Sequence, residues 1–523
     1  MIAGEAGTLA DPVAKGIWAT AKQSWCDLFR WKQRAVLTNE EGEIHCEWQS
    51  PAPLRNPFAL ASTLSAKGWL YFMVGLAAWM ADAVDFNGLS IQTVKLSEYY
   101  NTSYTNVTTA ITLTLLLRSV GALFFGLAGD RFGRKWPMVI NLLVLGVLQI
   151  ATTYAKTFGA FLGVRALFGL FMGGIYGNAT AMALENCPTE ARGLMSGILQ
   201  QGYSMGYVVA ASVNLGIGGS KDSWKIMFWV GAGFSFLVAL VRILFPESRQ
   251  FTEAKKARNN KPISARAFWA ETKTMLSKEW RMWIYCIILM AWFNSYVHTS
   301  QDSYITFLLT EKELPNNSAA RASILALTGA CVGGTIMGYI SQFFGRRRSI
   351  IVSVLMSCCM IPAWILPNKW TSLSATGFFL QFWAQAAFGV IPIHLNELAP
   401  PQFRSSFPGL TYQLGNMISS PSTQIVNAIS SSIKVKSKTG KPVDAYGPTM
   451  AVATAVIALL IALTTALGPE RRGAHFETAK VAGQAVDEPS KEIDDMESQR
   501  DSIKDDGIRS LKMIDNIKSD NHV

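Results

Sequence analysis

The sequence predicts an all-α membrane protein with twelve transmembrane helices arranged as two six-helix halves. Three observations support this fold class: an apolar composition, a series of long apolar runs, and an internal repeat. Half of the 523 residues are hydrophobic and 16% are charged, whereas a soluble domain carries about 25% charge. The mean hydropathy is +0.22. Runs of about 20 apolar residues are long enough to cross a hydrocarbon core of about 30 Å.

The apolar runs place the helices and the segments between them. We expect helices at residues 68–92, 107–128, 136–154, 158–181, 193–217, 224–245, 282–309, 320–343, 349–367, 372–396, 406–430 and 447–468. The domains follow as a cytoplasmic N-terminal arm (1–65), a first six-helix half (66–248), a cytoplasmic basic loop (249–281), a second half (282–468) and a disordered cytoplasmic tail (469–523). The tail is charged and poor in aromatic residues, which is typical of disorder.

The loops between the helices predict the orientation. Residues 249–281 contain nine basic and three acidic residues, and the positive-inside rule assigns such a loop to the cytoplasm. Glycosylation sequons at Asn101, Asn106 and Asn316 fall in loops expected outside. The loop 432–446 disagrees, because it carries four lysines and is also expected outside.

The N-terminal arm contains an aromatic and basic stretch at residues 17–34. Trp18, Trp25, Phe29 and Trp31 stand there among basic residues. Such a stretch is typical of a segment that lies on a membrane surface. A segment ordered only by contact with the helical body is the alternative.

A period of 212 residues runs through the chain, which indicates a duplicated half. Gly126, Gly133, Arg134 and Lys135 recur as Gly338, Gly345, Arg346 and Arg347, and Glu185, Pro188, Arg192, Gly197 and Gln201 recur as Glu397, Pro400, Arg404, Gly409 and Gln413. Two repeated six-helix halves are typical of secondary transporters, which bind their substrate between the halves.

The segment GLAGDRFGRK, residues 126–135, is expected to act in gating. Its glycines allow helices to approach closely, and Asp130 can accept hydrogen bonds from a helix end or an arginine. The second copy has Gln342 in place of Asp130, so its latch should be weaker. The predicted gating residues are Gly126, Asp130, Gly133, Arg134, Lys135, Glu185, Arg192, Glu397 and Arg404.

Arg118 lies within the second apolar run, twelve residues before Asp130, which is about 18 Å along a helix. An arginine at this depth must pair with an acid or a bound anion. It can grip a substrate carboxylate with two parallel hydrogen bonds. The alternative is a permanent salt bridge to Asp82 or Asp85 of the first helix. Either aspartate could instead carry the coupled proton.

The stretch NSYVHTSQDSYIT, residues 294–306, places polar side chains in an apolar run. On an α-helix Asn294, His298, Gln301 and Asp302 share one face, which must meet a watery cavity or a polar helix. A histidine one turn from an aspartate can hold a proton and bind a small anion. We expect His298 and Asp302 to handle the proton, with a position of Asp302 at the rim as the alternative.

Two further helices carry polar candidates. Gln413 and Asn416 stand three residues apart and can bind a carboxylate or hydroxyl without adding charge, or can bond to a neighbouring helix. Arg165, a lesser candidate for the polar site, shares a helix face with Gly169 and Gly173, which are interpreted as packing residues. The seven cysteines show no metal-ligand spacing, and no nucleophile–base set or nucleotide loop is present. We therefore expect no metal, no cofactor other than the coupling proton, no nucleic-acid partner and no enzymatic activity.

GLAGDRFGRK resembles the signature between helices 2 and 3 of the major facilitator superfamily. Residues 294–306 resemble the signature of the fungal lactate and pyruvate permeases, the Jen-type carboxylate–proton symporters. Asn294, His298, Ser300, Gln301, Asp302 and Thr306 match that pattern, and Val297 departs from it. The resemblance extends over the helical body, and it implies that Arg118, Gln413 and Asn416 bind substrate and that the protein resides in the plasma membrane.

The expected function is therefore proton-coupled import of a short monocarboxylate such as lactate, pyruvate or acetate. Arg118 would bind the carboxylate, with Asn294, His298, Gln301, Gln413 and Asn416 around it. A dicarboxylate symporter and a carboxylate sensor that does not transport are the alternatives. Expected partners are the carboxylate, membrane lipids, and ubiquitin or endocytic proteins through tail lysines at Lys480, Lys491, Lys504, Lys512 and Lys518.

Overall fold

The computed structural model describes residues 17–30, 33–38, 44–49, 53–217, 222–248, 251–252, 265–400 and 403–471. The chain divides into two units, Met1–Ala482 and Gly483–Val523, and the second lies wholly outside the described residues. Nearly all of the predicted tail, with its five candidate lysines, also lies outside them.

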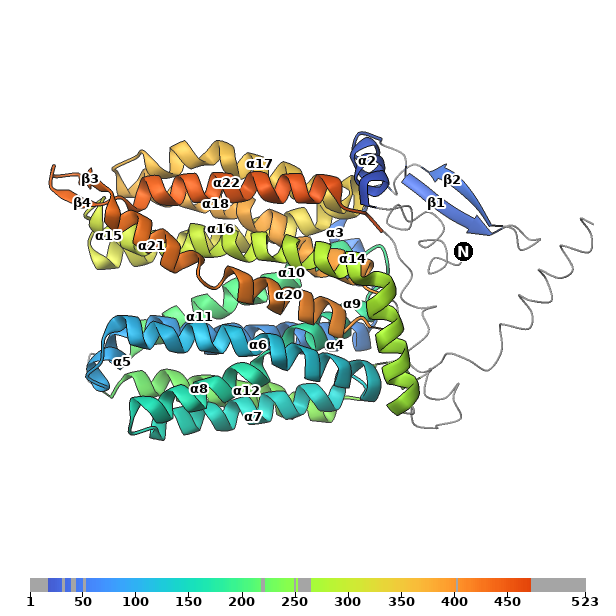
Figure 1. The fold of residues 1–523 in the computed structure, drawn as a ribbon, viewed down its shortest axis with the longest axis horizontal. Coiled ribbons are helices and arrows are strands. Elements are labelled where there is room, and N and C mark those ends of the chain that lie inside the picture. Colours follow the sequence, from blue (N-terminus) through green and yellow to red (C-terminus); the bar gives the residue numbers. More distant parts are fainter. Residues whose placement is uncertain are drawn as a thin grey trace, which may run out of the picture. The chain divides into compact units, whose positions relative to one another are not determined.

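The first half of the bundle follows a short N-terminal arm (Figure 1). The arm contains α2 (Ile17–Leu28), the antiparallel strands β1 (Gln33–Thr38) and β2 (Ile44–Gln49), and α3 (Pro57–Ser62). The helices of the first half are α4 (Ala66–Ile91), α5 (Thr93–Tyr99), α6 (Tyr104–Phe132), α7 (Lys135–Tyr154), α8 (Phe158–Met172), α9 (Ile175–Glu185), α10 (Arg192–Gln200), α11 (Gly202–Gly216) and α12 (Trp224–Leu244).

The second half repeats this series of helices. Its elements are α14 (Ala265–Val297), the π-helix η2 (His298–Asp302), α15 (Tyr304–Thr310), α16 (Asn316–Phe344), α17 (Arg346–Ile365), α18 (Trp370–Gly389), α19 (Ile391–Leu398), α20 (Ser406–Ser419), α21 (Ser422–Ser432), the paired strands β3 (Lys434–Lys436) and β4 (Pro442–Asp444), and α22 (Tyr446–Leu467).

Nine helical segments within the described ranges are long and apolar enough to cross a membrane. The other three predicted spans are also helical, but each is interrupted: at Gln201 between α10 and α11, by the π-helix η2, and between α20 and α21. The fourth and tenth predicted spans carry similar breaks, at Gly173–Gly174 and at Val390. The sequence pattern predicted each of these as one continuous helix.

The predicted boundary at residue 282 is wrong. The seventh long helix, α14, already begins at Ala265, so residues 265–281 of the predicted basic loop are helical. This part contains few helix breakers, and alanine, glutamate, lysine and methionine favour a helix regardless of membrane depth. Hydropathy therefore missed the helix boundary.

The two halves have equivalent turns, which supports the repeat. Gly133 after α6 and Gly345 after α16 have φ angles of +98° and +101°, which only glycine adopts readily. The halves then contact each other through α6 with α20, α9 with α20, and α10 with α16. We call the end of the bundle with these two turns the signature end. The opposite end, with Asn101, Asn106 and Asn316, is the sequon end.

The N-terminal arm is tied to the signature end. The guanidinium of Arg347 donates to the Ser24 carbonyl at 2.8 Å, and that of Arg348 donates to the Leu28 carbonyl at 2.8 Å. The last four carbonyls of a helix lack intrahelical partners, so Arg348 completes the end of α2, and Arg347 adds a contact one turn earlier. These bonds hold α2 against the helical body, which is the second of the two alternatives considered for this stretch.

The lysine-rich loop 432–446 forms the β3–β4 hairpin at the sequon end. Lys434 pairs with Asp444, and Thr439 donates to the Glu313 carboxylate at 2.6 Å. Glu311, two residues before Glu313, accepts the Gly447 N–H at 2.5 Å. Acidic side chains thus offset part of the charge that made this loop an exception to the positive-inside rule.

Candidate functional site

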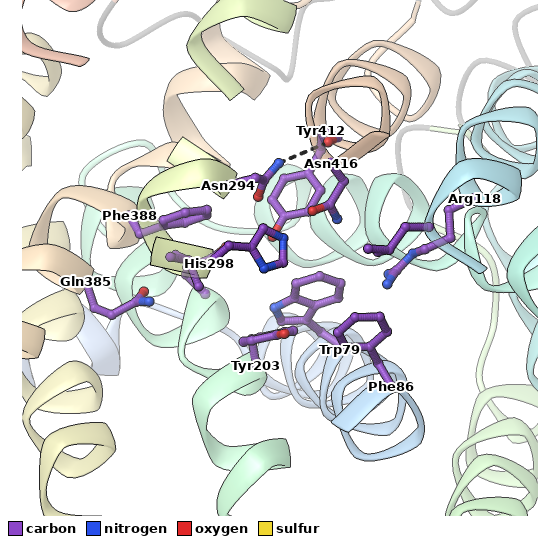
Figure 2. A pocket seen from close by; sticks show the side chains of 13 residues that line it. Trp79, Phe86, Arg118, Tyr203, Asn294, His298, Gln385, Phe388, Tyr412 and Asn416 are labelled. Atoms are coloured by element: carbon purple, nitrogen blue, oxygen red, sulfur yellow. Dashed lines mark hydrogen bonds between the residues drawn. The ribbon is translucent and has the colours of Figure 1, made fainter. Parts of the chain in front are cut away.

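A cavity lies between the two halves, within the middle part of the helices (Figure 2). Its free space, counted together with the solvent-open space at its mouth, is about 450 Å³. The lining residues come from both halves: Trp79, Phe86, Leu115, Arg118, Gln200 and Tyr203 from the first, and Asn294, Val297, His298, Gln385, Phe388, Tyr412 and Asn416 from the second.

Arg118 reaches this cavity from α6 and is buried. Its Nη2 donates to the Asp82 carboxylate at 2.6 Å, so the salt bridge that the sequence offered as an alternative is present. This ion pair leaves further hydrogen-bonding atoms on both side chains. Arg118 Nε and Asp82 Oδ1 have no hydrogen-bond partner among the described residues. Arg118 therefore pairs with Asp82 and still borders the space that a substrate could enter.

His298 faces the cavity from the opposite half, at the start of η2. Its Nδ1 lies 2.9 Å from Asp302 Oδ2, and the Thr423 hydroxyl of α21 donates to the same carboxylate oxygen at 2.6 Å. The side chain of Asp302 is 39% exposed, which corresponds to the position at the rim that the sequence left as the alternative. His298 is thus linked through one carboxylate to the solvent at the sequon end.

Asn294 and Asn416 also line the cavity, as predicted. Asn294 Nδ2 donates to the Tyr412 carbonyl at 3.4 Å, which joins α14 to α20 next to the cavity. Asn416 lies one helical turn before the end of α20, and its Nδ2 contacts Gln413 Oε1 at 3.4 Å. These two amides supply uncharged donors and acceptors on the side opposite Arg118.

Gln301 and Gln413 do not line the cavity, contrary to the prediction. Gln301 donates to the side chain of Gln381 in α18 at 2.9 Å. The expected shared face assumed α-helical spacing, and the π-helical turn changes the angle between successive side chains. Gln413 is fully buried, and its carbonyl accepts the Ser119 hydroxyl at 2.9 Å. The side-chain oxygen of Gln413 accepts a hydrogen bond from Asn416, so Gln413 helps to orient Asn416 without reaching the cavity.

Asp85 points away from the cavity, into the first half. Its carboxylate accepts the Ser235 hydroxyl at 3.3 Å and lies in the field of Arg165. Arg165 donates to Gln149 at 3.2 Å and stacks over Phe168 at 3.9 Å. The cluster is buried, and Arg165 does not line the cavity. Gly169 and Gly173 pack against the backbone of α6, as predicted.

Aromatic rings form much of the cavity wall, which the polar candidates did not predict. Tyr176 and Tyr412 stack at 4.0 Å across the halves, and Trp79 meets them edge-on at 4.8 and 5.8 Å. Tyr203 and Phe388 extend this group on either side. The only sequence signal was the spacing of Trp79 from Asp82, three residues along one helix. Tyr176 and Tyr412 belong to α9 and α20, which contact each other across the two halves.

The signature end is closed by contacts between the halves. The Asp130 carboxylate accepts the N–H groups of Ser405 and Ser406 at 3.0 and 2.9 Å, at the start of α20. The Asn178 side chain accepts the Ser405 hydroxyl at 2.8 Å. A carboxylate at a helix N-terminus is favoured by the helix dipole. This is the bond between Asp130 and a helix end that the sequence predicted, although its role in gating stays a prediction.

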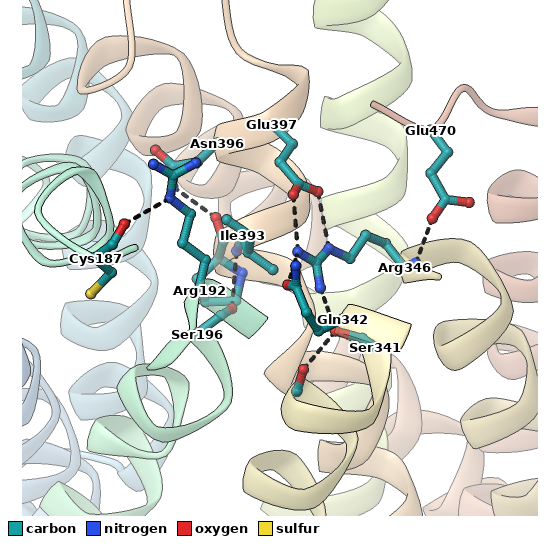
Figure 3. Close-up of polar contacts among 12 residues, drawn as sticks. Cys187, Arg192, Ser196, Ser341, Gln342, Arg346, Ile393, Asn396, Glu397 and Glu470 are labelled. Carbon is teal, nitrogen blue, oxygen red and sulfur yellow. Dashed lines mark hydrogen bonds and ion pairs between the residues drawn. The ribbon is translucent and has the colours of Figure 1, made fainter. Parts of the chain in front are cut away.

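The other predicted gating residues surround this seal. Arg134 donates to Glu185 at 2.9 Å, and the repeat-related Arg346 donates to Glu397 at 2.9 and 3.0 Å (Figure 3). Burial disfavours the charge on Arg134, but Glu185 and Asp130 outweigh it and raise its pKa.

The remaining members of the predicted set take varied positions at the same end. Arg192 donates to the Cys187 carbonyl at 3.1 Å, Gly126 packs against Ser406, and buried Arg404 lies in the field of Glu185. The N–H of Lys135 donates to Glu247 at 2.9 Å, and that of Arg346 donates to Glu470 at 2.6 Å. These two glutamates, each following a Pro after the last helix of its half, were not predicted.

The three sequon asparagines are exposed, and their glycosylation stays a prediction. Within the described ranges, no group of three or more His, Cys, Asp and Glu residues could hold a metal ion. The cavity instead offers one guanidinium, one imidazole, several amides and an aromatic wall. This set suits a small organic anion with an apolar body.

A twelve-span bundle of two repeated halves with a central polar cavity defines a secondary transporter. The model of the family "Sugar (and other) transporter" matches residues 57–278 and 281–513. The chain belongs to this family, within the major facilitator superfamily. It is therefore a multi-pass carrier rather than an enzyme.

Two sequence relatives narrow this class, and a solved structure shares the fold. A carboxylic acid transporter protein homolog of Saccharomyces cerevisiae is 31% identical over 80% of this chain and 70% of the yeast protein. A cis,cis-muconate transport protein of Acinetobacter baylyi is 21% identical over 68% of this chain and 86% of its own length. The proton:xylose symporter XylE shares the fold, with a TM-score of 0.60 and 14% identity over 78% of this chain and 98% of XylE. The two sequence relatives support a carboxylate transporter.

Proposed function

We propose that this protein is a proton-coupled symporter that imports short monocarboxylates such as lactate and pyruvate across the plasma membrane by alternating access. The observation that carries the proposal is Arg118, a cation at the cavity whose Nε has no partner among the described residues. The resemblance of residues 294–306 to the Jen-type signature and the similarity to the yeast carboxylic acid transporter homolog support the choice of substrate.

In this scheme the carboxylate binds Arg118 in competition with Asp82. A guanidinium can donate several hydrogen bonds in a fork, so it can hold the substrate while its bond to Asp82 weakens. Asn294 and Asn416 bind the other oxygens of the substrate from the second half. The substrate thus bridges the two halves and can lower the free energy of the state in which they close around it.

The balance of charge between Arg118, Asp82 and the substrate indicates which residue takes up the coupled proton. A substrate anion that takes over Arg118 leaves Asp82 as a buried carboxylate without full compensation, and burial disfavours the charged form. Asp82 is therefore expected to take up a proton as the substrate arrives. His298 and Asp302 lie on the side toward the sequon end, and they are placed to deliver that proton from outside.

The test is uptake of labelled lactate into proteoliposomes under an imposed proton gradient. Arg118→Lys keeps the charge and removes the fork, and we expect at least a tenfold loss of uptake. Arg118→Ala alone would leave Asp82 buried and unpaired, at a cost of roughly 3–5 kcal/mol. The double variant Arg118→Ala/Asp82→Asn removes both charges, so it separates loss of binding from loss of folding. Normal lactate uptake by the correctly folded double variant would end the proposal.

A dicarboxylate symporter is the second candidate. His298 faces the same cavity as Arg118 and, when protonated, would offer a second positive charge to a diacid. The cis,cis-muconate named for one relative is such a diacid. Arg165 does not line the cavity, so it does not provide this second charge. Strong competition of labelled lactate uptake by succinate would favour this candidate. Ligand binding without counterflow would instead indicate a sensor.

A further inference from the structure

The indole N–H of Trp79 is a buried donor that the proposed binding scheme does not use. Trp79 lies in α4 and is 2% exposed, and its N–H has no hydrogen-bond partner among the described residues. Trp79 lines the cavity, and Figure 2 shows its indole between the side chains of His298 and Arg118. A buried donor without a protein acceptor is costly unless a ligand or water bonds to it. Of the two described tryptophans with such an N–H, Trp79 is the one that borders the cavity.

Packing fixes the orientation of this indole. Tyr176, Tyr203 and Tyr412 surround it with ring centroids at 4.8, 5.9 and 5.8 Å. An aromatic side chain held on several sides cannot rotate to find another acceptor. The direction of the N–H is therefore a fixed property of the cavity.

The carboxylate of the substrate does not need this donor. Arg118 uses Nη2 for Asp82, while its Nε has no partner among the described residues. A guanidinium carries five N–H donors, which is enough for Asp82 and for both oxygens of a second carboxylate. The Trp79 N–H then remains for a further oxygen of the substrate.

A neighbouring acceptor completes the site. Gln200 at the end of α10 lines the same cavity, and its Oε1 has no hydrogen-bond partner among the described residues. A hydroxyl group can accept from an N–H and donate to an amide oxygen, and a keto oxygen can use the N–H alone. An unsubstituted acid such as propionate can use neither group.

We propose that Trp79 is a substrate-positioning residue whose indole N–H donates to an oxygen substituent next to the carboxylate, so that the cavity selects hydroxy and keto monocarboxylates over unsubstituted ones. Gln200 accepts from the substrate when that substituent is a hydroxyl. This inference rests on the proposed function and specifies its substrate class.

The test compares three acids of similar size in proteoliposomes: lactate, pyruvate and propionate. Trp79→Phe keeps an aromatic ring and removes the N–H. We expect it to raise KM for lactate and pyruvate about tenfold, the order of one buried hydrogen bond, and to change KM for propionate less than about twofold. The maximal rates should change little, because the ring still fills the wall.

Trp224→Phe is the matched control. Trp224 is also buried with an unpartnered N–H among the described residues, but it packs with Leu89, Leu96 and Phe228 and does not line the cavity. Its replacement should leave all three KM values unchanged. Gln200→Met is a second variant, expected to raise KM for lactate more than for pyruvate.

The outcomes separate the two proposals. Equal changes for all three acids, or no change in either variant, would overturn the role of Trp79 and leave the proposed function intact. A wild-type protein that takes up none of the three would overturn the proposed function and this inference with it. If Trp79→Phe does not fold, Gln200→Met and a wild-type KM for propionate at least tenfold above that for lactate decide the question.

Discussion

Arg118 and Asp82 form a buried ion pair beside the cavity, and the energetics of that pair determine how the site can work. Removing one partner of a buried pair costs roughly 3–5 kcal/mol, mostly because the other charge is left without compensation. A bound anion can replace the aspartate only if the aspartate is neutralised at the same time. Coupling between substrate and proton can therefore arise from two residues.

Asp82→Asn tests this coupling, because it replaces one carboxylate oxygen by an amide nitrogen. The amide keeps the volume and an acceptor for Arg118, but it cannot take up a proton. We expect lactate counterflow between equal pH values to persist and accumulation driven by a proton gradient to be lost. Both are measured in the same proteoliposomes. Accumulation at the wild-type level would show that Asp82 does not carry the proton.

Asp85→Asn is the comparison variant for this experiment. Asp85 is also buried in α4, but it faces Ser235 and Arg165 rather than the cavity. We expect gradient-driven accumulation to remain, with lower thermal stability because Arg165 loses a charged neighbour. The reverse result, with coupling lost only in this variant, would move the proton to Asp85.

Several polar residues that line the cavity were predicted from the sequence, whereas the aromatic ones were not. Arg118, Asn294, His298 and Asn416 stand out because polar groups in apolar runs need a partner or a cavity. Trp79 gives no such signal, since an aromatic ring in a membrane helix usually packs in the core or against lipid. Its place in the wall depends on tyrosines from three other helices, which the sequence alone does not bring together.

Breaks within the helices also escaped the sequence pattern. Hydropathy measures the length of an apolar run, whereas a π-turn or a kink depends on where individual backbone hydrogen bonds go. The break at η2 moved Gln301 away from the cavity and toward Gln381. By contrast, the positions of the twelve spans and of the repeat depend on composition and spacing, and these were predictable.

The segment 53–65, here called the strap, contacts both halves at the signature end. Tyr339 of α16 donates to the Arg55 carbonyl at 2.5 Å, and the Arg55 side chain pairs with Glu190 at 2.6 Å. That ion pair is half exposed, so it contributes less than about 1 kcal/mol. Leu60 and Leu64 are buried in a cluster with residues of α9, α10 and α19, and they provide most of the attachment.

Leu60→Ala should therefore weaken the strap more than loss of Arg55. Truncation of a buried leucine costs roughly 2–5 kcal/mol, and here the loss falls on the state in which the signature end is closed. We expect the KM for external substrate to rise several-fold, because the state open to the sequon end becomes less populated. The measurement is initial uptake rate against external lactate.

Phe58→Ala is the control for the strap. Phe58 lies in the same short helix, but it is 83% exposed and buries little against the bundle. Its replacement should leave KM unchanged. An equal rise in both variants would indicate a general effect of the arm on expression or folding rather than a contact that closes the signature end.

At the signature end the two halves have equivalent ion pairs, but the contacts of each half with the other differ. Arg134–Glu185 and Arg346–Glu397 are equivalent by the repeat. Asp130 adds two bonds from its carboxylate to the start of α20 in the other half. Its counterpart Gln342 accepts from Arg346 at 2.8 Å within its own half. Beside it, Gly193 of the first half and Gly338 of the second bring α10 and α16 together. One side of the seal is thus charged and the other depends on close packing.

Asp130→Asn should open the signature end more often than Gln342→Ala. An amide can accept one of the two N–H bonds but lacks the charge, and a hydrogen bond to a charged group contributes about 1.5–3 kcal/mol. Cys187 reports the opening, since burial raises the pKa of its thiol to about 12 and the thiolate is the reactive form. In a variant that retains only Cys187 of the seven cysteines, we expect Asp130→Asn to speed alkylation near neutral pH about tenfold, and Gln342→Ala less than about twofold. Equal rates in the two variants would mean that the charged contact does not hold the halves together, and that the close packing of α10 against α16 closes the path.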